Sequence, residues 1–277
     1  MKPVALALVR PLSISSNPSH SQSHPLFYQP KTLPQTQSPA FRVLCSSLQS
    51  KPVKLEDTTS KPEYKPGILD DLFLNLFRNK LVQEVGWDSE QPGYDGLIEV
   101  ANRLMMKGRT NSDTREATVR ILVSLFPPFL LDLYRILIAP IGGGKVAAMM
   151  VARVTALTCQ WLMGTCTVNS VDLPDGTSCR SGVFVERCKY LEESKCVGIC
   201  TNTCKLPTQT FFKDYMGVPL LMEPNFSDYS CQFKFGVLSP LPEDDIALKE
   251  PCLEICPNAT RRREVARAMD VPQCPKA

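Results

Sequence analysis

Cysteine is abundant in this chain of 277 residues, whereas histidine is almost absent. Nine of the twelve cysteines lie between Cys166 and Cys256, and the only two histidines, His20 and His24, lie within the first 25 residues. Histidine is the commonest general base and a frequent metal ligand. Chemistry carried out beyond those first residues must therefore use thiolates and carboxylates.

The cysteines of the second half follow a pattern that suits a metal. The candidates after position 180 are Cys188, Cys196, Cys200, Cys204, Cys231, Cys252 and Cys256. Soft thiolates favour iron, and zinc fits less well because its cysteine pairs are more often two residues apart than three. In one unbroken helix Cys196 and Cys204 would lie about 12 Å apart, too far for one cluster. Either the helix breaks near Gly198, or these cysteines do not share one metal.

The first residues indicate the compartment. Residues 1–55 contain no Asp or Glu, six Lys or Arg, ten Ser and eight Pro. The apolar run Val4 to Val9 ends at Arg10 and is too short for a secretory signal, so the composition predicts an organelle transit peptide. A plastid is favoured over a mitochondrion or secretion, with processing near Cys45. A reducing stroma disfavours permanent disulfides, although unliganded or disulfide-forming thiols stay an alternative to a metal.

Charge argues against nucleic-acid binding. Residues 56–277 carry 25 Lys or Arg and 28 Asp or Glu, a net charge of −3. Proteins that bind nucleic acid through its phosphates are usually basic. We therefore expect no nucleic acid among the partners.

Composition divides the chain into four parts. We expect a chloroplast transit peptide over 1–45, a polar, proline-punctuated linker over 46–66, a helical part over 67–164 and a Cys-rich part over 165–277. The predicted fold class is mainly α, with a helical N-terminal half packed with a Cys-rich α+β C-terminal lobe. The two parts are expected to form one compact domain.

Periodicity predicts five helices in the first of these parts. The first ends at Gly86, and its expected inward stripe is Leu69, Leu72, Phe73, Leu76, Phe77 and Leu81. The others are expected over 94–107, from residue 112 or 113 to 125, over 129–139 and over 145–163. Pro127 and Pro128 separate the third helix from the fourth.

The fifth predicted helix, over 145–163, is apolar on nearly every side. Lys145 opens it and Arg153 lies in its middle, which argues against a membrane span. We expect a core helix surrounded by the other four, with docking to a membrane surface as the alternative. Its methionines could also line a groove for a hydrophobic ligand. In that case Arg153 should face the protein interior or a carboxylate.

Three long stretches resemble one family. They are YKPGILDDLFLNLFRNKL, the Cys-rich block from VERCKYLEESKCVGICTNTCKLP to FSDYSCQFKFG, and LKEPCLEICPNATRRRE. Over about 200 residues the chain resembles the plastid β-carotene isomerases of the Dwarf-twenty-seven family. The resemblance implies an iron-dependent enzyme that converts all-trans-β-carotene to 9-cis-β-carotene, early in strigolactone biosynthesis. It does not supply a list of catalytic residues.

The implied chemistry agrees with the residues. Rotation about a polyene double bond needs transient loss of its bond order, which a cysteine-bound iron or a reversible cysteine adduct could provide. For iron we expect Cys196, Cys200 and Cys204 with one of Cys188, Cys231, Cys252 or Cys256, and for the substrate Met149, Met150, Arg153, Phe211 and Phe212. Cys45 and Cys274 are the least favoured ligands, and Cys159 is expected to be a small buried apolar residue.

The expected setting follows from the substrate. The enzyme should work in the chloroplast stroma with transient contact to a membrane or plastoglobule surface, and it should supply a carotenoid cleavage dioxygenase. Two other functions stay open. One is a cysteine-ligated iron module for electron transfer, and the other is a non-catalytic carotenoid carrier.

Overall fold

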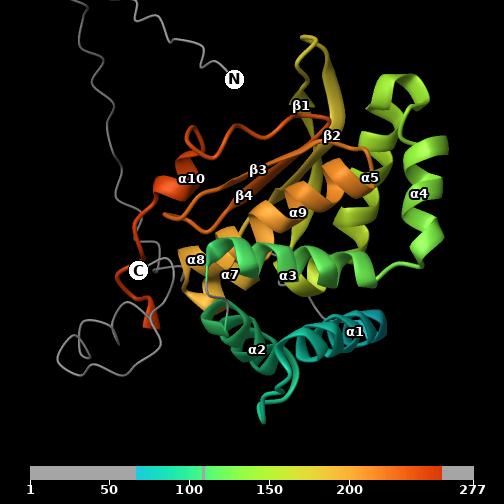
Figure 1. The fold of residues 1–277 in the computed structure, drawn as a ribbon. Helices are drawn as coiled ribbons and strands as arrows, with labels where there is room; N and C mark the ends of the chain where they lie inside the picture. Colours follow the sequence, from blue (N-terminus) through green and yellow to red (C-terminus); the bar gives the residue numbers. More distant parts are fainter. Residues whose placement is uncertain (1–66, 108–109, 258–277) are drawn as a thin grey trace, which may run out of the picture. The chain divides into compact units, whose positions relative to one another are not determined.

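The computed structural model describes residues 67–107 and 110–257, and the structural statements below refer to those ranges. The chain separates into two units, Met1–Glu56 and Asp57–Ala277, and all described residues belong to the second. The predicted transit peptide and linker, residues 1–66, therefore lie outside the described residues. Figure 1 shows a mainly helical chain with a small sheet from its second half. This confirms the fold class predicted from the sequence.

Three helices open the described part of the chain. They are α1 (Ile68–Val85), α2 (Gly93–Lys107) and α3 (Asn111–Ser124). α1 ends at Gly86, as predicted, because Gly86 adopts a φ of 73° that side-chain-bearing residues rarely take. Thr110 caps α3: its hydroxyl accepts a bond from the Asp113 amide at 3.2 Å, while the Asp113 carboxylate accepts one from the Thr110 amide at 2.9 Å.

Only part of the predicted stripe of α1 is buried. Phe77 and Leu81 pack in a cluster with residues of α2 and α3. Leu69, Leu72 and Leu76, expected to face inward, are exposed. The prediction was wrong for these three because periodicity gives the direction of a stripe, whereas the neighbours that cover it reach only the C-terminal half of α1.

The structure has two helices where one helix was predicted over 145–163. α4 (Pro128–Leu137) is joined through η1 (Ile141–Gly144) to α5 (Lys145–Thr158), and α6 (Gln160–Met163) follows. Cys159, with φ −113° and ψ 8°, separates α5 from α6. α5 packs one face against β2, and Met150, Val154 and Leu157 on its other face are exposed. The expectation that this helix is surrounded on all sides was therefore wrong.

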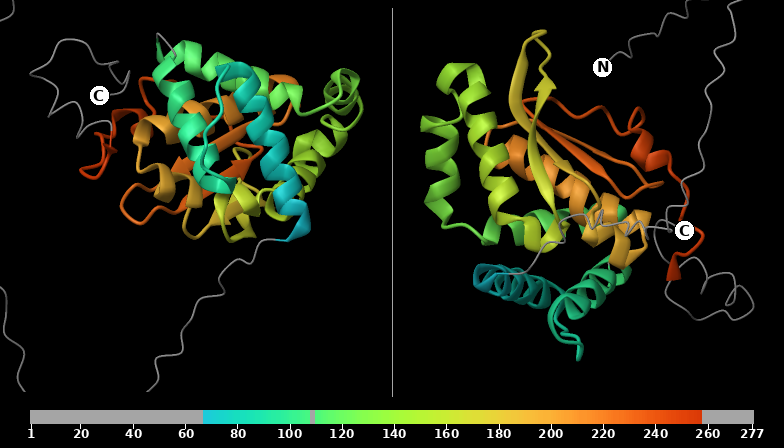
Figure 2. Two further views of the ribbon diagram at one scale, coloured as in Figure 1. Left: turned by 90° about the horizontal axis from the view of Figure 1, so that it is seen from below. Right: turned by 180° about the vertical axis from the view of Figure 1, so that it is seen from behind.

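A four-stranded antiparallel sheet forms beside α5. Its strands are β1 (Cys166–Asp172), β2 (Ser178–Val185), β3 (Leu220–Pro224) and β4 (Cys231–Phe235), in the order β1-β2-β4-β3. β3 is thus an edge strand. The right-hand view of Figure 2 shows the sheet and α5 from behind, with α1 and α2 below them.

A helical run between β2 and β3 carries the cysteine motif. It comprises α7 (Lys189–Ser194), α8 (Val197–Ile199), η2 (Cys200–Lys205), α9 (Leu206–Thr210) and η3 (Phe211–Tyr215), and α10 (Ile246–Lys249) follows the sheet. η2 has π geometry, and the Leu206 amide bonds to the Thr201 carbonyl five residues earlier. Pro207 explains the wide turn, because it lacks the N–H that an α-helix would donate to Thr203.

The Cys-rich helical run lies between the sheet and the first helices. η2 and α9 contact α3, while α9 also contacts β3. The larger core cluster combines Met105 of α2 with Val151 of α5 and Phe235 of β4. Side chains from both predicted parts of the chain thus pack in one core.

Within the described ranges, no single helix is long and apolar enough to cross a membrane. α3 and α4 reach the necessary length and apolar composition only when they are taken together, and the two helices are bent by 88° relative to each other.

Candidate functional site

Four of the seven candidate cysteines converge. Cys200 and Cys204 lie one turn apart on η2, Cys188 precedes α7, and Cys231 opens β4. All four line one small enclosed cavity of about 20 Å³, together with Tyr190 and others. That volume is of the order of one water molecule. Convergence depends on the sheet, because β4 brings Cys231 beside a helix more than twenty residues earlier.

Burial determines the protonation state of these four thiols. It raises the pKa of Cys200, Cys204 and Cys231 above the ordinary value of 9.0, and the proximity of the other thiols raises it further. Burial also raises the pKa of Cys188. The ammonium of Lys205 acts in the opposite direction on Cys200 and Cys231. The quartet Cys188, Cys200, Cys204 and Cys231 therefore rests as neutral thiols at neutral pH.

The described side chains do not form a ready iron site. Among residues 67–107 and 110–257, no group of three or more His, Cys, Asp or Glu is arranged to hold a metal. The backbone is helical without interruption from Val197 through Tyr215, and the helical run breaks just before Gly198, at Lys195 and Cys196. Iron therefore stays a prediction.

Three candidate ligands lie apart from the quartet's cavity. Cys196 precedes α8 and its sulfur accepts a bond from the Ile199 amide at 3.5 Å. Cys252 and Cys256 pack against the larger core cluster, and neither lines the cavity. Cys159 is half-buried between α5 and α6. Cys45 and Cys274 lie outside the described residues.

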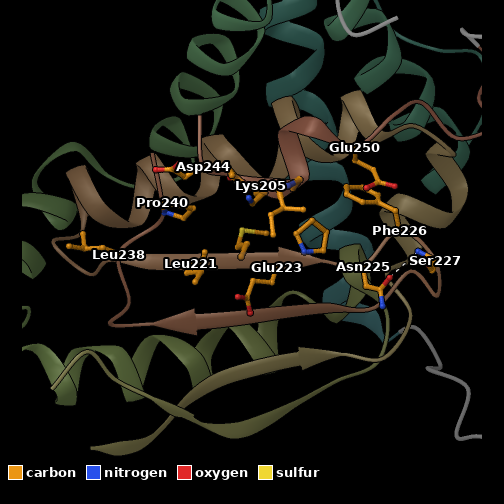
Figure 3. A pocket seen from close by; sticks show the side chains of 15 residues that line it. Lys205, Leu221, Glu223, Asn225, Phe226, Ser227, Leu238, Pro240, Asp244 and Glu250 are labelled. Atoms are coloured by element: carbon orange, nitrogen blue, oxygen red, sulfur yellow. Dashed lines mark hydrogen bonds and ion pairs between the residues drawn. The ribbon is translucent and has the colours of Figure 1, made fainter. Parts of the chain in front are cut away.

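A much larger cavity, of about 640 Å³, runs along the edge strand β3. Figure 3 shows it between β3 and the segment that leads to α10, from Leu238 and Pro240 at one end to Phe226 and Ser227 at the other. Five strand residues span about 16 Å. Eight of the fifteen lining residues are apolar, among them Leu221, whereas Lys205 and four carboxylates also line the cavity. The cavity therefore suits an elongated, mainly apolar ligand.

A buried ion pair lies at the boundary of this cavity. The ammonium of Lys205, on η2, bonds to the carboxylate of Asp245, and both side chains are almost fully buried. The second oxygen of Asp245 accepts a bond from the Ala247 amide at 3.0 Å and thereby begins α10. The pair thus joins η2, which carries two of the four thiols, to the segment that covers the large cavity.

The two cavities share part of their walls. Lys205, Met222 and Pro224 line both of them. Met222 is fixed in place because its amide donates to the Gln209 side chain at 2.9 Å, while its own side chain is buried. A ligand along β3 would thus be separated from the quartet by one layer of side chains, one of which is a flexible thioether.

The side chains predicted to bind substrate lie elsewhere. Met149 is half-buried on α5, whereas Met150 and Arg153 are exposed there. Phe211 is buried against Phe126, and Phe212 packs on Phe235. None of the five lines the large cavity. The expectation that Arg153 faces the interior or a carboxylate was wrong, because the exposed face of α5 carries it.

Sequence reasoning missed Lys205, Asp245, Met222 and Phe226. Lys205 follows Cys204 directly, and a lysine beside a cysteine motif was the one available signal. Nothing local marks Asp245, which reaches Lys205 only through the fold.

Comparison with known proteins gives one consistent family. Residues 161–244 match the family described as Beta-carotene isomerase D27-like, C-terminal. A relative from Arabidopsis thaliana named Beta-carotene isomerase D27, chloroplastic, is 37% identical over 203 residues, 72% of this chain and 74% of the relative. A relative of the same name from Medicago truncatula is 34% identical over 202 residues, 73% of this chain and 78% of the relative. No solved structure matches.

Proposed function

The chain belongs to the β-carotene isomerase D27-like family, and from that premise we propose that it is a carotenoid isomerase whose substrate lies along β3. One observation carries the assignment of the site. The apolar cavity of about 640 Å³ shares the walls formed by Lys205, Met222 and Pro224 with the cavity of four thiols.

The thiols supply a route to rotation when the Met222 side chain moves out of the wall that the two cavities share. Addition of an S–H group across one polyene double bond breaks the S–H bond and the π bond and forms one C–S and one C–H bond, which leaves a carbon–carbon single bond free to rotate. Loss of the sulfur and one hydrogen then regenerates the thiol and restores the double bond in the other geometry, so that no atom or electron is gained or lost overall. The quartet rests as neutral thiols, and Lys205 favours the thiolate of Cys200 and Cys231.

The finer assignment follows the family. We infer all-trans-β-carotene as the substrate and 9-cis-β-carotene as the product, at an early step of strigolactone biosynthesis and upstream of a carotenoid cleavage dioxygenase. The apolar part of the cavity's lining, with Leu221, Phe226 and Leu238, supports a hydrocarbon ligand. The names of both relatives contain "chloroplastic", which supports a chloroplast location. A fluorescent fusion of residues 1–60 tests this, because cytosolic fluorescence would contradict it.

Isomer analysis tests the function. The purified chain is incubated with all-trans-β-carotene in detergent, with and without added iron, and the isomers are separated by chromatography. We expect a cis isomer to accumulate, and Cys200→Ser and Cys231→Ser to reduce its rate. Cys179→Ser, which alters a buried cysteine outside the quartet, is the matched control.

Each result discriminates among the candidate functions. Carotene that binds and emerges unchanged under both conditions would indicate a carrier and would overturn the proposal. Turnover that is lost equally in the Cys179 and Cys200 variants would overturn the thiol assignment. Turnover that requires iron would show that a metal site forms which the described residues do not display.

A further inference from the structure

Almost none of the helix α4 is buried. Of its ten residues, only Leu131 is buried, although the sequence is PFLLDLYRIL. Leu131 shares one side of the helix with Tyr134, whose hydroxyl donates to the Ala147 carbonyl at 3.4 Å, and with Arg135, which bonds to the Asp214 carbonyl at 3.3 Å. This side attaches α4 to the rest of the protein.

The opposite side of α4 is apolar and exposed. At 100° per residue, Phe129, Leu133 and Ile136 lie about 140° to 160° away from Leu131 on the attached side. Their exposed fractions are 70%, 50% and 65%. A water-soluble helix normally places charged side chains there and apolar ones inward. The polarity of α4 is reversed.

α5 continues this apolar surface. Met150, Val154 and Leu157 recur at four- and three-residue steps on the side that faces away from β2, and Leu157 is 79% exposed. Three successive glycines, Gly142 to Gly144, all with positive φ, reverse the chain between the two helices. Figures 1 and 2 show α4 and α5 side by side. We call Phe129, Leu133, Ile136, Met150, Val154 and Leu157 the α4–α5 face.

The charges around this face favour an anionic partner. Between residues 126 and 158 the charged residues are Asp132, Arg135, Lys145 and Arg153. Asp132 pairs with Arg135 at 3.1 Å and Lys145 with Asp175 at 2.7 Å, whereas Arg153 has no ion pair within the described residues. Arg153 lies one turn from both Met150 and Leu157. An exposed apolar surface whose own helices carry an unpaired cation and no unpaired acid is complementary to an anionic lipid surface.

We propose that the α4–α5 face docks onto a lipid bilayer containing anionic lipids, with α4 and α5 lying in the interface. The proposal rests on the proposed function, because a hydrocarbon substrate must be taken from a lipid phase. A second copy of the chain fits less well: a twofold contact through the same face would bring the two Arg153 side chains together.

Flotation of the full chain with vesicles tests the proposal. We expect the wild type to float with vesicles of mixed zwitterionic and anionic phospholipid, and less with purely zwitterionic ones. Ile136→Glu with Leu157→Glu should reduce the floating fraction at least about tenfold, because two apolar anchors are lost and two anions gained. Both side chains are largely exposed, so the fold should tolerate these changes.

A matched pair on α1 is the control. Leu69→Glu with Leu72→Glu changes two leucines of similar exposure, 64% and 61%, on α1, outside this face. This variant should float like the wild type. Equal loss in both double variants, or no flotation of the wild type, would overturn the proposal. So would a wild-type dimer in solution that the Ile136 and Leu157 changes convert to a monomer, because the face would then be a protein interface.

Activity in two media separates this proposal from the function. In detergent, the Ile136 and Leu157 variant should isomerise carotene at the wild-type rate, whereas with carotene in vesicles its rate should fall about as much as its flotation. Intact vesicle binding without turnover in either medium would overturn the isomerase assignment and leave the docking face standing. Loss of turnover in detergent alongside normal flotation would overturn the docking role of these two residues.

Discussion

Lys205 and Asp245, forty residues apart in the chain, form an ion pair whose side chains are 2% and 5% exposed. Two charges removed from water are stabilised only by each other and by their remaining hydrogen bonds. Here the Asp245 carboxylate also accepts a hydrogen bond from the Ala247 amide, so both of its oxygens have a partner. The pair joins the thiol-bearing helix η2 to α10, and its loss should affect both cavities.

Removal of one partner should destabilise the protein strongly. We expect Lys205→Met to lower the free energy of unfolding by about 3–5 kcal/mol, because the Asp245 carboxylate is left buried without its cation. Urea denaturation measures the change. The double variant Lys205→Met with Asp245→Asn should be more stable than Lys205→Met alone, since no unpaired charge remains. A double variant no more stable than Lys205→Met would contradict the buried pairing.

The thiol quartet should make stability depend on alkaline pH. Burial raises the pKa of Cys200, Cys204 and Cys231 above 9.0, so the folded protein keeps protons that the unfolded chain releases. The stabilisation is fully present below about pH 9, and the free energy of unfolding falls as pH rises further. Urea titrations on both sides of pH 9 measure it.

Variants identify the source of that slope. In Cys200→Ala with Cys231→Ala, the free energy of unfolding should decline less steeply above pH 9 than in the wild type. Cys179→Ala, which changes a buried cysteine outside the quartet, is the control. An unchanged slope in the double variant would show that other groups cause the decline.

The sequence predicted the elements better than their surroundings. Gly86 and the paired prolines at 127 and 128 are local signals, and the helix boundaries beside them agree with the structure. The break at Cys159 has no such signal, because no proline or glycine stands there. Whether an apolar residue such as Leu69 is buried depends on which neighbour covers it, and the periodicity of one segment does not contain that information.

The candidate site was predictable only where it is local. Cys200 and Cys204 are four residues apart, so any helix places them together. Cys188 and Cys231 join them because β4 pairs with β2 and the chain leaves β2 beside η2. The cavity along β3 is a product of sheet order and of the segment leading to α10, which is why the aromatic and methionine residues chosen from the sequence lie outside it.

Met222 should control access from the large cavity to the thiols. Met222→Ala removes most of one side chain in the shared wall, and we expect faster labelling of the quartet by an apolar maleimide, together with a stability loss of about 2–5 kcal/mol. Met163→Ala also enlarges the thiol cavity but does not line the large one. It should lose comparable stability without the same gain in labelling. Similar labelling of both variants would indicate general loosening.

Occupation of the large cavity should depend on Leu221. Its half-buried side chain lines the cavity from β3, so Leu221→Trp should narrow the space available to a polyene. We expect carotene binding, measured by the shift of its visible absorption on titration with protein, to weaken about tenfold or more, a change of about 1.4 kcal/mol. Leu241→Trp is the matched control, because Leu241 lies close along the chain to Pro240 but is exposed and does not line the cavity. If both variants bind carotene like the wild type while remaining folded by circular dichroism, the substrate does not lie along β3.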